Sequence, residues 1–153
     1  MSMSFIKASL EDLPIIQRIV QQTINAIYTY YYKESIVKFF LEHHCPENIL
    51  NDLKLERVFI LYDNDIPVGT GSIADNHITR LFVLPEFQKK GYGSYIMDRL
   101  ERMVSEQYTK AVLDSSFPAF DLYLKRNYQP MEYKNLVLEN GDVLCYYTME
   151  KQL

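Results

Sequence analysis

The sequence predicts a mixed α/β fold in which one β-sheet carries helices on both faces. Strand-like and helix-like segments follow in the order strand, two helices, three strands, helix, strand, helix and two strands. The chain has 153 residues, enough to bury one sizeable core. Its composition, 48% hydrophobic and 24% charged, is that of an ordinary globular protein. We therefore expect a single domain over residues 1–153.

The chain is expected to begin with a short strand and an amphipathic helix. The strand is predicted at residues 5–9. Ser9 followed by Asp12 has the pattern of a capping box at a helix start. Apolar residues then recur at helical spacing from Leu13 to Ile27, which predicts one helix with a buried face.

A second helical region is predicted from residue 36 to residue 53, after a tyrosine-rich interruption. The interruption contains "YTYYY", from Tyr28 to Tyr32. The second region is expected to break at Cys45-Pro46, because proline suits the first turn of a helix and not its middle.

From Arg57 onward the sequence is rich in strand-forming residues. Residues 57–85 predict a three-strand meander, with turn signals at its two corners. A helix over residues 94–106, a strand over 110–116 and a helix beginning near Pro118 are expected to follow. The chain then ends in a hairpin joined at Asn140-Gly141, a dipeptide that tolerates the positive φ angles of a tight turn.

Composition excludes several classes of function. A net charge of −4 argues against broad nucleic-acid binding, which needs a surplus of cations. No apolar run reaches the length that spans a bilayer, and the first residues lack the pattern of a signal peptide. Cys45 and Cys145 have no metal-ligand spacing, so we expect reduced packing residues, no metal and a cytoplasmic location.

The segment from residue 88 to residue 94 joins an apolar strand to a helix, and it contains Gly91, Gly93, Lys89 and Lys90. Helix N-termini expose free amides, and glycine lets a bound group approach the backbone, so the turn predicts a phosphate cradle. A plain connection with two solvated lysines explains the same residues equally well. The turn fits neither the Walker A pattern nor the three-glycine dinucleotide fingerprint.

With its flanks, the turn resembles a known signature. "LFVLPEFQKKGYGSYIM" is similar to the acetyl-CoA signature of the GCN5-related N-acetyltransferase (GNAT) superfamily, with Val83, Pro85, Gln88, Gly91 and Gly93 in register. The order of elements agrees over nearly the whole chain. The resemblance implies a GNAT-like α+β fold with a mixed, mainly antiparallel sheet of about seven strands. It also implies a cofactor cleft where the fourth and fifth strands splay apart.

The resemblance implies acetyl-CoA as cosubstrate, without a metal. Backbone amides of the turn would wrap the pyrophosphate, and the preceding strand would hydrogen-bond the pantetheine arm. Ser116 lies where many relatives use an asparagine to contact the cofactor. The cofactor-binding residues implied in this way are Leu81, Phe82, Val83, Gln88, Lys89, Lys90, Gly91, Tyr92, Gly93, Ser94 and Ser116.

Two catalytic residues are implied by position. "YLKRNY" matches the family's Tyr-x-x-x-Gly-Phe with Asn127 in place of glycine, and Tyr123 then stands at the position of the general acid. The alternative is that Tyr123 is one of 13 tyrosines packed in a core. Counting back from Gln88 places His77 where the histone-acetylating branch has its basic glutamate. An exposed histidine in a turn, without a catalytic role, explains the residue equally well.

Three other groups of residues are possible members of a functional site. Metal binding at His43-His44 is not expected, because adjacent helical residues point in different directions. Asp114 ends a strand and contacts either the substrate or a helix start. Some of the rings from Tyr28 to Tyr32 are expected to line the acceptor pocket, since they cannot all face the core.

The sequence thus predicts an N-acetyltransferase that acts on a primary amine of a small molecule by direct attack. Peptide or protein acetylation, and a catalytically inactive acyl-CoA-binding regulatory domain, are the alternatives. The expected partners are acetyl-CoA and an amine acceptor, with no nucleic acid and no membrane. The apolar C-terminal strands also suggest a homodimer, because edge strands pair readily.

Overall fold

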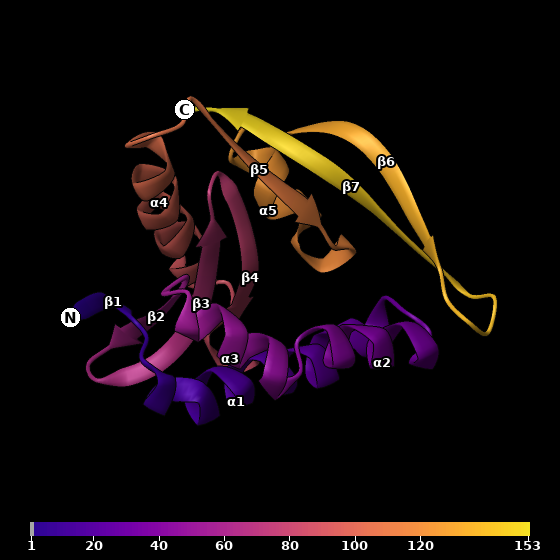
Figure 1. Ribbon diagram of the computed structural model, residues 1–153, viewed down its shortest axis with the longest axis horizontal. Coiled ribbons are helices and arrows are strands. Elements are labelled where there is room, and N and C mark those ends of the chain that lie inside the picture. The colour runs from indigo at the N-terminus through magenta and orange to yellow at the C-terminus, as the bar shows by residue number, and fades with distance from the viewer. Residues whose placement is uncertain (1) are drawn as a thin grey trace.

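A computed structural model describes residues 2–153 and contains one seven-stranded sheet in the order β1-β2-β3-β4-β5-β7-β6 (Figure 1). All neighbouring strands are antiparallel except β4 and β5, which are parallel. The predicted fold class, a mixed and mainly antiparallel sheet with flanking helices, is confirmed. The strands are β1 (Met3–Lys7), β2 (Val58–Asp63), β3 (Ile66–Ala74), β4 (His77–Val83), β5 (Lys110–Ser115), β6 (Gln129–Val137) and β7 (Val143–Gln152).

The helices form a layer on each side of the sheet (Figure 1). One layer holds α1 (Leu13–Ile27), α2 (Glu34–His43) and α3 (Pro46–Lys54), and the other holds α4 (Tyr92–Ser105) and α5 (Phe120–Lys125). Within residues 2–153, no helix combines the length and the apolar character that a membrane crossing requires.

The core is divided by the sheet into two clusters. Strand β2 shows why, because successive side chains of a strand point to opposite faces. Val58 and Ile60 pack against α1 and α3, whereas Phe59 and Leu61 pack against α4. All four are buried, so β2 is a central strand with both faces covered.

The predicted helix boundaries hold where a specific residue sets them. The amide of Ser9 donates to Asp12 Oδ2 at 2.8 Å, which closes the predicted capping box ahead of a short 3₁₀ turn and α1. Pro46 is the first residue of α3, so the break between α2 and α3 falls at Cys45-Pro46 as expected. Both cysteines carry free thiols.

The sheet opens between β4 and β5. These strands pair at one position, His77 with Val112, and the amide of Val112 donates to the carbonyl of Asn76 at 2.9 Å. Beyond this point β4 continues to Val83 beside β3, while β5 continues beside β7. The two strands therefore diverge from His77 onward and leave a V-shaped opening in the sheet.

A β-bulge interrupts β4 halfway along its length. Thr79 pairs with Ser72 and Phe82 pairs with Thr70, so Arg80 and Leu81 together face the single residue Gly71. Arg80 takes a left-handed φ of 49°, which is unusual for a residue with a side chain. The bulge lies beside the opening, where it redirects the side chains of the strand.

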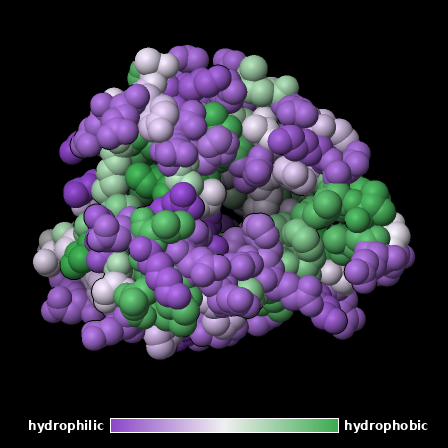
Figure 2. All heavy atoms as spheres, in the orientation of Figure 1, coloured by the Kyte–Doolittle hydropathy of each residue, from purple (hydrophilic) through white to green (hydrophobic). Residues whose placement is uncertain are grey.

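The β6–β7 hairpin reaches across the opening to α2 (Figure 1). At its tip, Gly141 has the positive φ expected for the turn, 89°. The carboxylate of Asp142 accepts hydrogen bonds from Ser35 Oγ and, at 3.4 Å, from Lys33 Nζ at the start of α2. Figure 2 shows that this face is hollowed beside the hairpin and that apolar side chains gather on the hairpin itself.

Candidate active site

The turn between β4 and α4 has a backbone that points its amides outward. Lys89 and Gly91 both have positive φ, 62° and 88°. Gln88 anchors the turn, because its side-chain amide donates to the carbonyl of Val83 at 3.0 Å. Within residues 2–153, no amide from Lys89 to Ser94 donates to a protein group. This row of free donors lies at the N-terminus of α4, the ordinary setting for an anion.

The two glycines of the turn serve different purposes. A Cβ atom on Gly91 would meet nothing within 4 Å, so its positive φ is the reason for glycine there. Gly93 lies in the first turn of α4, where a Cβ would make only ordinary contacts, 3.5 Å from Leu122 Cδ2 and 3.9 Å from Val83 Cγ2. The packing of the protein does not demand a glycine at position 93. Its missing side chain instead leaves the amides accessible.

A groove of about 860 Å³ runs from this turn along β4. The amide of Leu84 donates to Val68 of β3. Since successive amides of a strand face opposite edges, the amide of Val83 faces the open side. The groove is lined on its floor and walls by most of the predicted cofactor residues: Leu81, Phe82, Val83, Gln88, Lys89, Gly91, Tyr92, Gly93 and Ser94.

Lys90 and Ser116 do not line this groove. Lys90 is exposed, and its Nζ lies over the Phe87 ring, 5.6 Å from the centroid. Ser116 lies on the other side of the opening, where its Oγ is 3.3 Å from the hydroxyl of Tyr28. The roles of these two residues toward the cofactor stay predictions.

A second cavity, of about 330 Å³, lies on the far side of the opening. It is enclosed by α2, by β4 and β5, and by the β6–β7 hairpin, which contributes Leu136, Leu144 and Tyr146. Tyr28, Leu81 and Phe82 line both this cavity and the groove. The two spaces therefore adjoin at the bulge of β4.

Tyr123, on α5, lies in the wall of the second cavity. Its side chain is buried and packs against Tyr128, with ring centroids 5.7 Å apart. It lines the second cavity, and among residues 2–153 its hydroxyl has no hydrogen-bond partner. Burial, with a smaller contribution from Tyr28, raises the pKa of Tyr123 well above that of a free tyrosine. The hydroxyl therefore stays protonated at neutral pH and is a hydrogen-bond donor in the wall of the cavity.

His77 and Asp114 also line the second cavity. His77 is exposed and stands at the single bridge between β4 and β5, where the opening begins. Asp114 lies within β5, and its Oδ1 accepts a hydrogen bond from Thr148 Oγ1 at 2.7 Å. Of the two roles considered for Asp114, its position favours contact with a ligand, because it caps no helix.

The tyrosine-rich segment divides between packing and lining. Tyr28 is buried and lines both spaces, and Tyr30 and Tyr31 line the groove. Tyr32 has a packing role: its ring stacks on Phe117, and its hydroxyl accepts a hydrogen bond from the Phe117 amide at 2.8 Å.

His43, His44 and Arg80 form a cluster in the second cavity that no sequence pattern indicates. Arg80 Nε donates to His44 Nδ1 at 3.2 Å, and Arg80 Nη1 donates to Asp52 Oδ2 at 2.6 Å. Burial, then the charges of Arg80 and His43, lower the pKa of His44 to about 3. His44 is therefore neutral, and its Nδ1 lone pair is already used. It cannot serve as a base at neutral pH.

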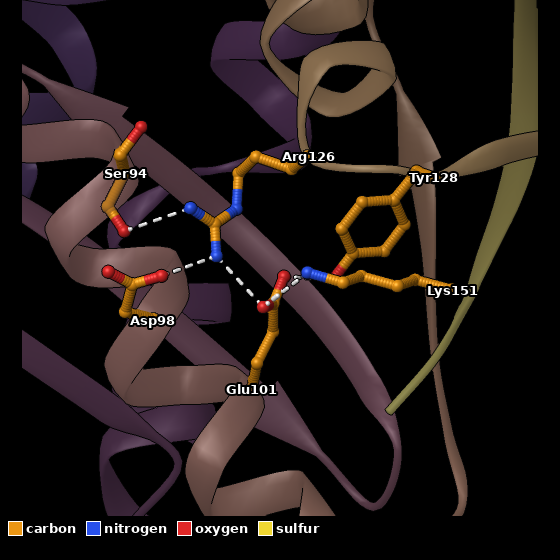
Figure 3. Close-up of polar contacts among 6 residues, drawn as sticks. All are labelled: Ser94, Asp98, Glu101, Arg126, Tyr128 and Lys151. Atoms are coloured by element: carbon orange, nitrogen blue, oxygen red, sulfur yellow. Dashed lines mark hydrogen bonds and ion pairs between the residues drawn. The ribbon is translucent and has the colours of Figure 1, made fainter.

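A buried charge network ties the cofactor turn to the helix that carries Tyr123 (Figure 3). Arg126, just after α5, donates to the carbonyl of Ser94 at 3.4 Å and to Glu101 Oε1 at 2.8 Å. Glu101 also accepts from Tyr128 and Lys151, each at 2.8 Å. The Glu101 carboxylate thus joins α4 to the segment after α5 and to β7, and Arg126 extends the network to the first turn of α4.

Solved structures with the same fold include several acetyltransferases. A GCN5-related N-acetyltransferase from Rhodopseudomonas palustris is 23% identical, with a TM-score of 0.87 over 100% of this chain and 99% of that one. The PaiA N-acetyltransferase from Thermoplasma acidophilum, in complex with coenzyme A, is 19% identical, with a TM-score of 0.76 and full coverage of both chains. Naa50 from Arabidopsis thaliana, in complex with the bisubstrate analogue CoA-Ac-MVNAL, is 16% identical, with a TM-score of 0.69 and full coverage of both chains.

These structural likenesses show the fold, and a family comparison shows the family. No curated protein matches the chain in sequence. The family model of the acetyltransferase (GNAT) domain, however, matches residues 20–153, which include both spaces and the junction between them. The chain therefore belongs to the GNAT acetyltransferase family.

Proposed function

We propose that the chain transfers the acetyl group of acetyl-CoA to the primary amine of a small molecule by direct attack. One observation carries the proposal. A groove with a row of free amides and a smaller cavity with a protonated tyrosine meet at the bulge of β4. A cosubstrate on one side and an acceptor on the other would come into contact there.

The residues of the groove fit acetyl-CoA. The free amides from Lys89 to Ser94 suit a pyrophosphate, and Gly93 leaves them accessible. The open edge of β4 suits the amide groups of the pantetheine arm, which would add to the sheet like a strand. When bound, acetyl-CoA supplies a thioester whose carbonyl carbon an amine can attack.

The catalytic roles fall to residues that line the two spaces. His77, directly or through water, takes the proton that the ammonium must lose before its lone pair attacks the carbonyl carbon. An amide of the Leu81–Val83 segment polarises the carbonyl oxygen. When the carbon–nitrogen bond has formed and the carbon–sulfur bond breaks, Tyr123 donates a proton to the leaving thiolate. The acylated nitrogen loses its second proton to water, and the phenol regains a proton from water.

The hairpin favours a small acceptor over a peptide. Asp142 bonds the hairpin tip to the start of α2, so the second cavity is roofed on the side away from the groove. Its volume of about 330 Å³ lies at the lower end of the range of small-molecule sites. Acetylation of a peptide or protein remains the alternative, and the Naa50 likeness gives it a precedent in the same fold. An inactive acyl-CoA-binding domain is the other alternative.

Calorimetry and a thiol-release assay test the proposal together. Acetyl-CoA should bind the wild type. In a panel of small amines and short peptides, the small amines should give thiol release and the peptides should not. Tyr123→Phe should lower kcat by about 10²- to 10⁴-fold, the usual contribution of a general acid, without weakening acetyl-CoA binding. Tyr108→Phe, at an exposed position beyond α4, is the matched control and should match the wild type. Binding without turnover of any acceptor would identify an inactive domain.

A further inference from the structure

The side chain of Arg80 lines the acceptor cavity and has no part in the proposed reaction. Its left-handed φ in the bulge of β4 turns it beneath α2 and α3. Only 7% of the side chain is exposed. A guanidinium group buried to this degree needs compensating charge or a ligand.

The carboxylate beside Arg80 does not fully compensate its charge. Asp52 Oδ2 lies 2.6 Å from Arg80 Nη1, and Asp52 Oδ1 lies 3.8 Å from Arg57 Nη1. Two guanidinium groups thus share one carboxylate. The remaining partner, His44, accepts the Nε proton as a neutral imidazole. Together these four side chains carry one net positive charge.

Arg80 also keeps a donor for a ligand. Nε and Nη1 are engaged by His44 and Asp52, while Nη2 has no hydrogen-bond partner within residues 2–153. Nη2 is not among the buried atoms that lack a partner, so it remains reachable from the cavity. A guanidinium edge of this kind binds a carboxylate with charge-assisted hydrogen bonds.

Besides two charged positions, the cavity combines aromatic and aliphatic side chains with neutral polar groups, among them the hydroxyls of Ser115, Ser116 and Tyr146. Phe39, Phe40 and Phe82 form its wall near α2. Apart from Arg80, the lining residue with a formal charge is Asp114, on the opposite strand of the splayed pair. The cavity therefore offers a cation on β4, an anion on β5 and an aromatic surface.

We infer that the acceptor is an amine that also carries a carboxylate on an apolar body, with the carboxylate bound by Arg80. The amine then lies toward Asp114 and the junction with the groove, and the apolar body lies against the phenylalanine rings. This inference rests on the proposed acetyl transfer and specifies its acceptor.

Matched pairs of acceptors test the inference. Phenylalanine and phenethylamine differ only in the carboxylate, as do leucine and isopentylamine. In the thiol-release assay, the carboxylated member of each pair should have a kcat/KM about 10- to 100-fold higher, as expected for a charge-assisted hydrogen bond. Equal rates, or faster acetylation of the plain amine, would overturn the inference.

Two variants test whether Arg80 causes the preference for the carboxylated acceptor. In Arg80→Gln the preference for the carboxylated member should disappear, with acetyl-CoA binding unchanged. Arg57→Gln also removes a partner of Asp52 but does not line the cavity, so it should keep the preference. If Arg80→Gln does not fold, Arg80→Lys retains the charge without the planar fork and should lower the preference severalfold. A preference that survives either Arg80 variant intact would place the carboxylate elsewhere.

A ligand without an amine separates this inference from the proposed function. 3-Phenylpropanoate has the carboxylate and the ring but cannot be acetylated. Calorimetry should detect its binding to the wild type in the presence of CoA, at least 10-fold tighter than to Arg80→Gln. Such binding without turnover of any amine would refute the acetylation of amino-carboxylates but retain the anion site. Absence of binding would refute the anion site even if plain amines were acetylated.

Discussion

The neutral state of His44 makes the stability of the fold depend on pH. Burial and the nearby charges of Arg80 and His43 lower the pKa of His44 to about 3, whereas a histidine in an unfolded chain has a pKa of about 6.5. Between these values the unfolded chain binds a proton that the folded chain does not. Stability is therefore complete above pH 6.5 and falls as the pH drops toward 3. From pH 7 to pH 5, these two pKa values give a loss of about 2 kcal/mol.

Urea unfolding of the wild type and His44→Gln at pH 7 and pH 5 measures this loss. The chain has no tryptophan, so far-UV circular dichroism is the suitable signal. A glutamine can still accept the Nε proton of Arg80 through its side-chain oxygen, but it does not titrate. The loss between the two pH values should be smaller in His44→Gln by about 2 kcal/mol, because all other titrating groups are common to both proteins.

Equal losses in the two proteins would refute the reasoning. So would an NMR titration in which the imidazole of His44 takes up a proton near pH 6.5 in the folded state. His43→Gln provides a comparison, since burial lowers the pKa of His43 in the same direction but its side chain is more exposed. Its effect on the pH dependence should be smaller than that of His44→Gln.

Three further predictions concern the turn, the charge network and the hairpin. Gly93→Ala should leave the unfolding midpoint unchanged or slightly higher but weaken acetyl-CoA binding at least 10-fold by calorimetry, since its Cβ enters the cradle and meets no crowded protein atom. Glu101→Gln should lower the unfolding free energy by about 3 kcal/mol, because it leaves buried cations unpaired, whereas Asp98→Asn, at an exposed partner of Arg126, should cost less than about 1 kcal/mol. Asp142→Ala should raise the acceptor KM severalfold without changing acetyl-CoA affinity, because it frees the hairpin from α2; an unchanged acceptor KM would show that the hairpin contact does not shape the cavity.

The parts of the fold that depend on local interactions could be predicted from the sequence. The capping box at Ser9, the proline at the start of α3 and the glycine of the last turn each act within a few residues, and all three lie where expected. Asn127 also takes the left-handed φ, 71°, that its match to the family's glycine required. β6 extends back to Gln129 because the strand pairs with β7 as far as Glu150.

The second cavity could not be predicted because it is assembled from distant segments. Arg80 looked like an ordinary strand residue, and only the pairing of β4 with β3 reveals the bulge that turns it beneath α2. His43 and His44 were considered for a metal site and not for a pocket wall. The break before Pro46 ends α2 at His43 and leaves the His44 ring against Phe82 of β4, which no local pattern could indicate.

The opening in the sheet and the bulge in β4 act as one device. A parallel sheet that kept its hydrogen bonds beyond His77 would use the edge of β4 for β5 and leave none for a cosubstrate. Because the strands part there, the β4 edge is open to the groove while its other edge remains fixed to β3. The bulge lies in the part of β4 that pairs with β3 alone. The extra residue therefore interrupts the hydrogen bonds to one neighbouring strand and not to two. The bulge directs the guanidinium of Arg80 into the second cavity, while the residues that follow Arg80 line the groove. The same short segment, Arg80 to Val83, therefore supplies a wall of each space, so straightening the backbone of the bulge should alter the shapes of the second cavity and the groove together.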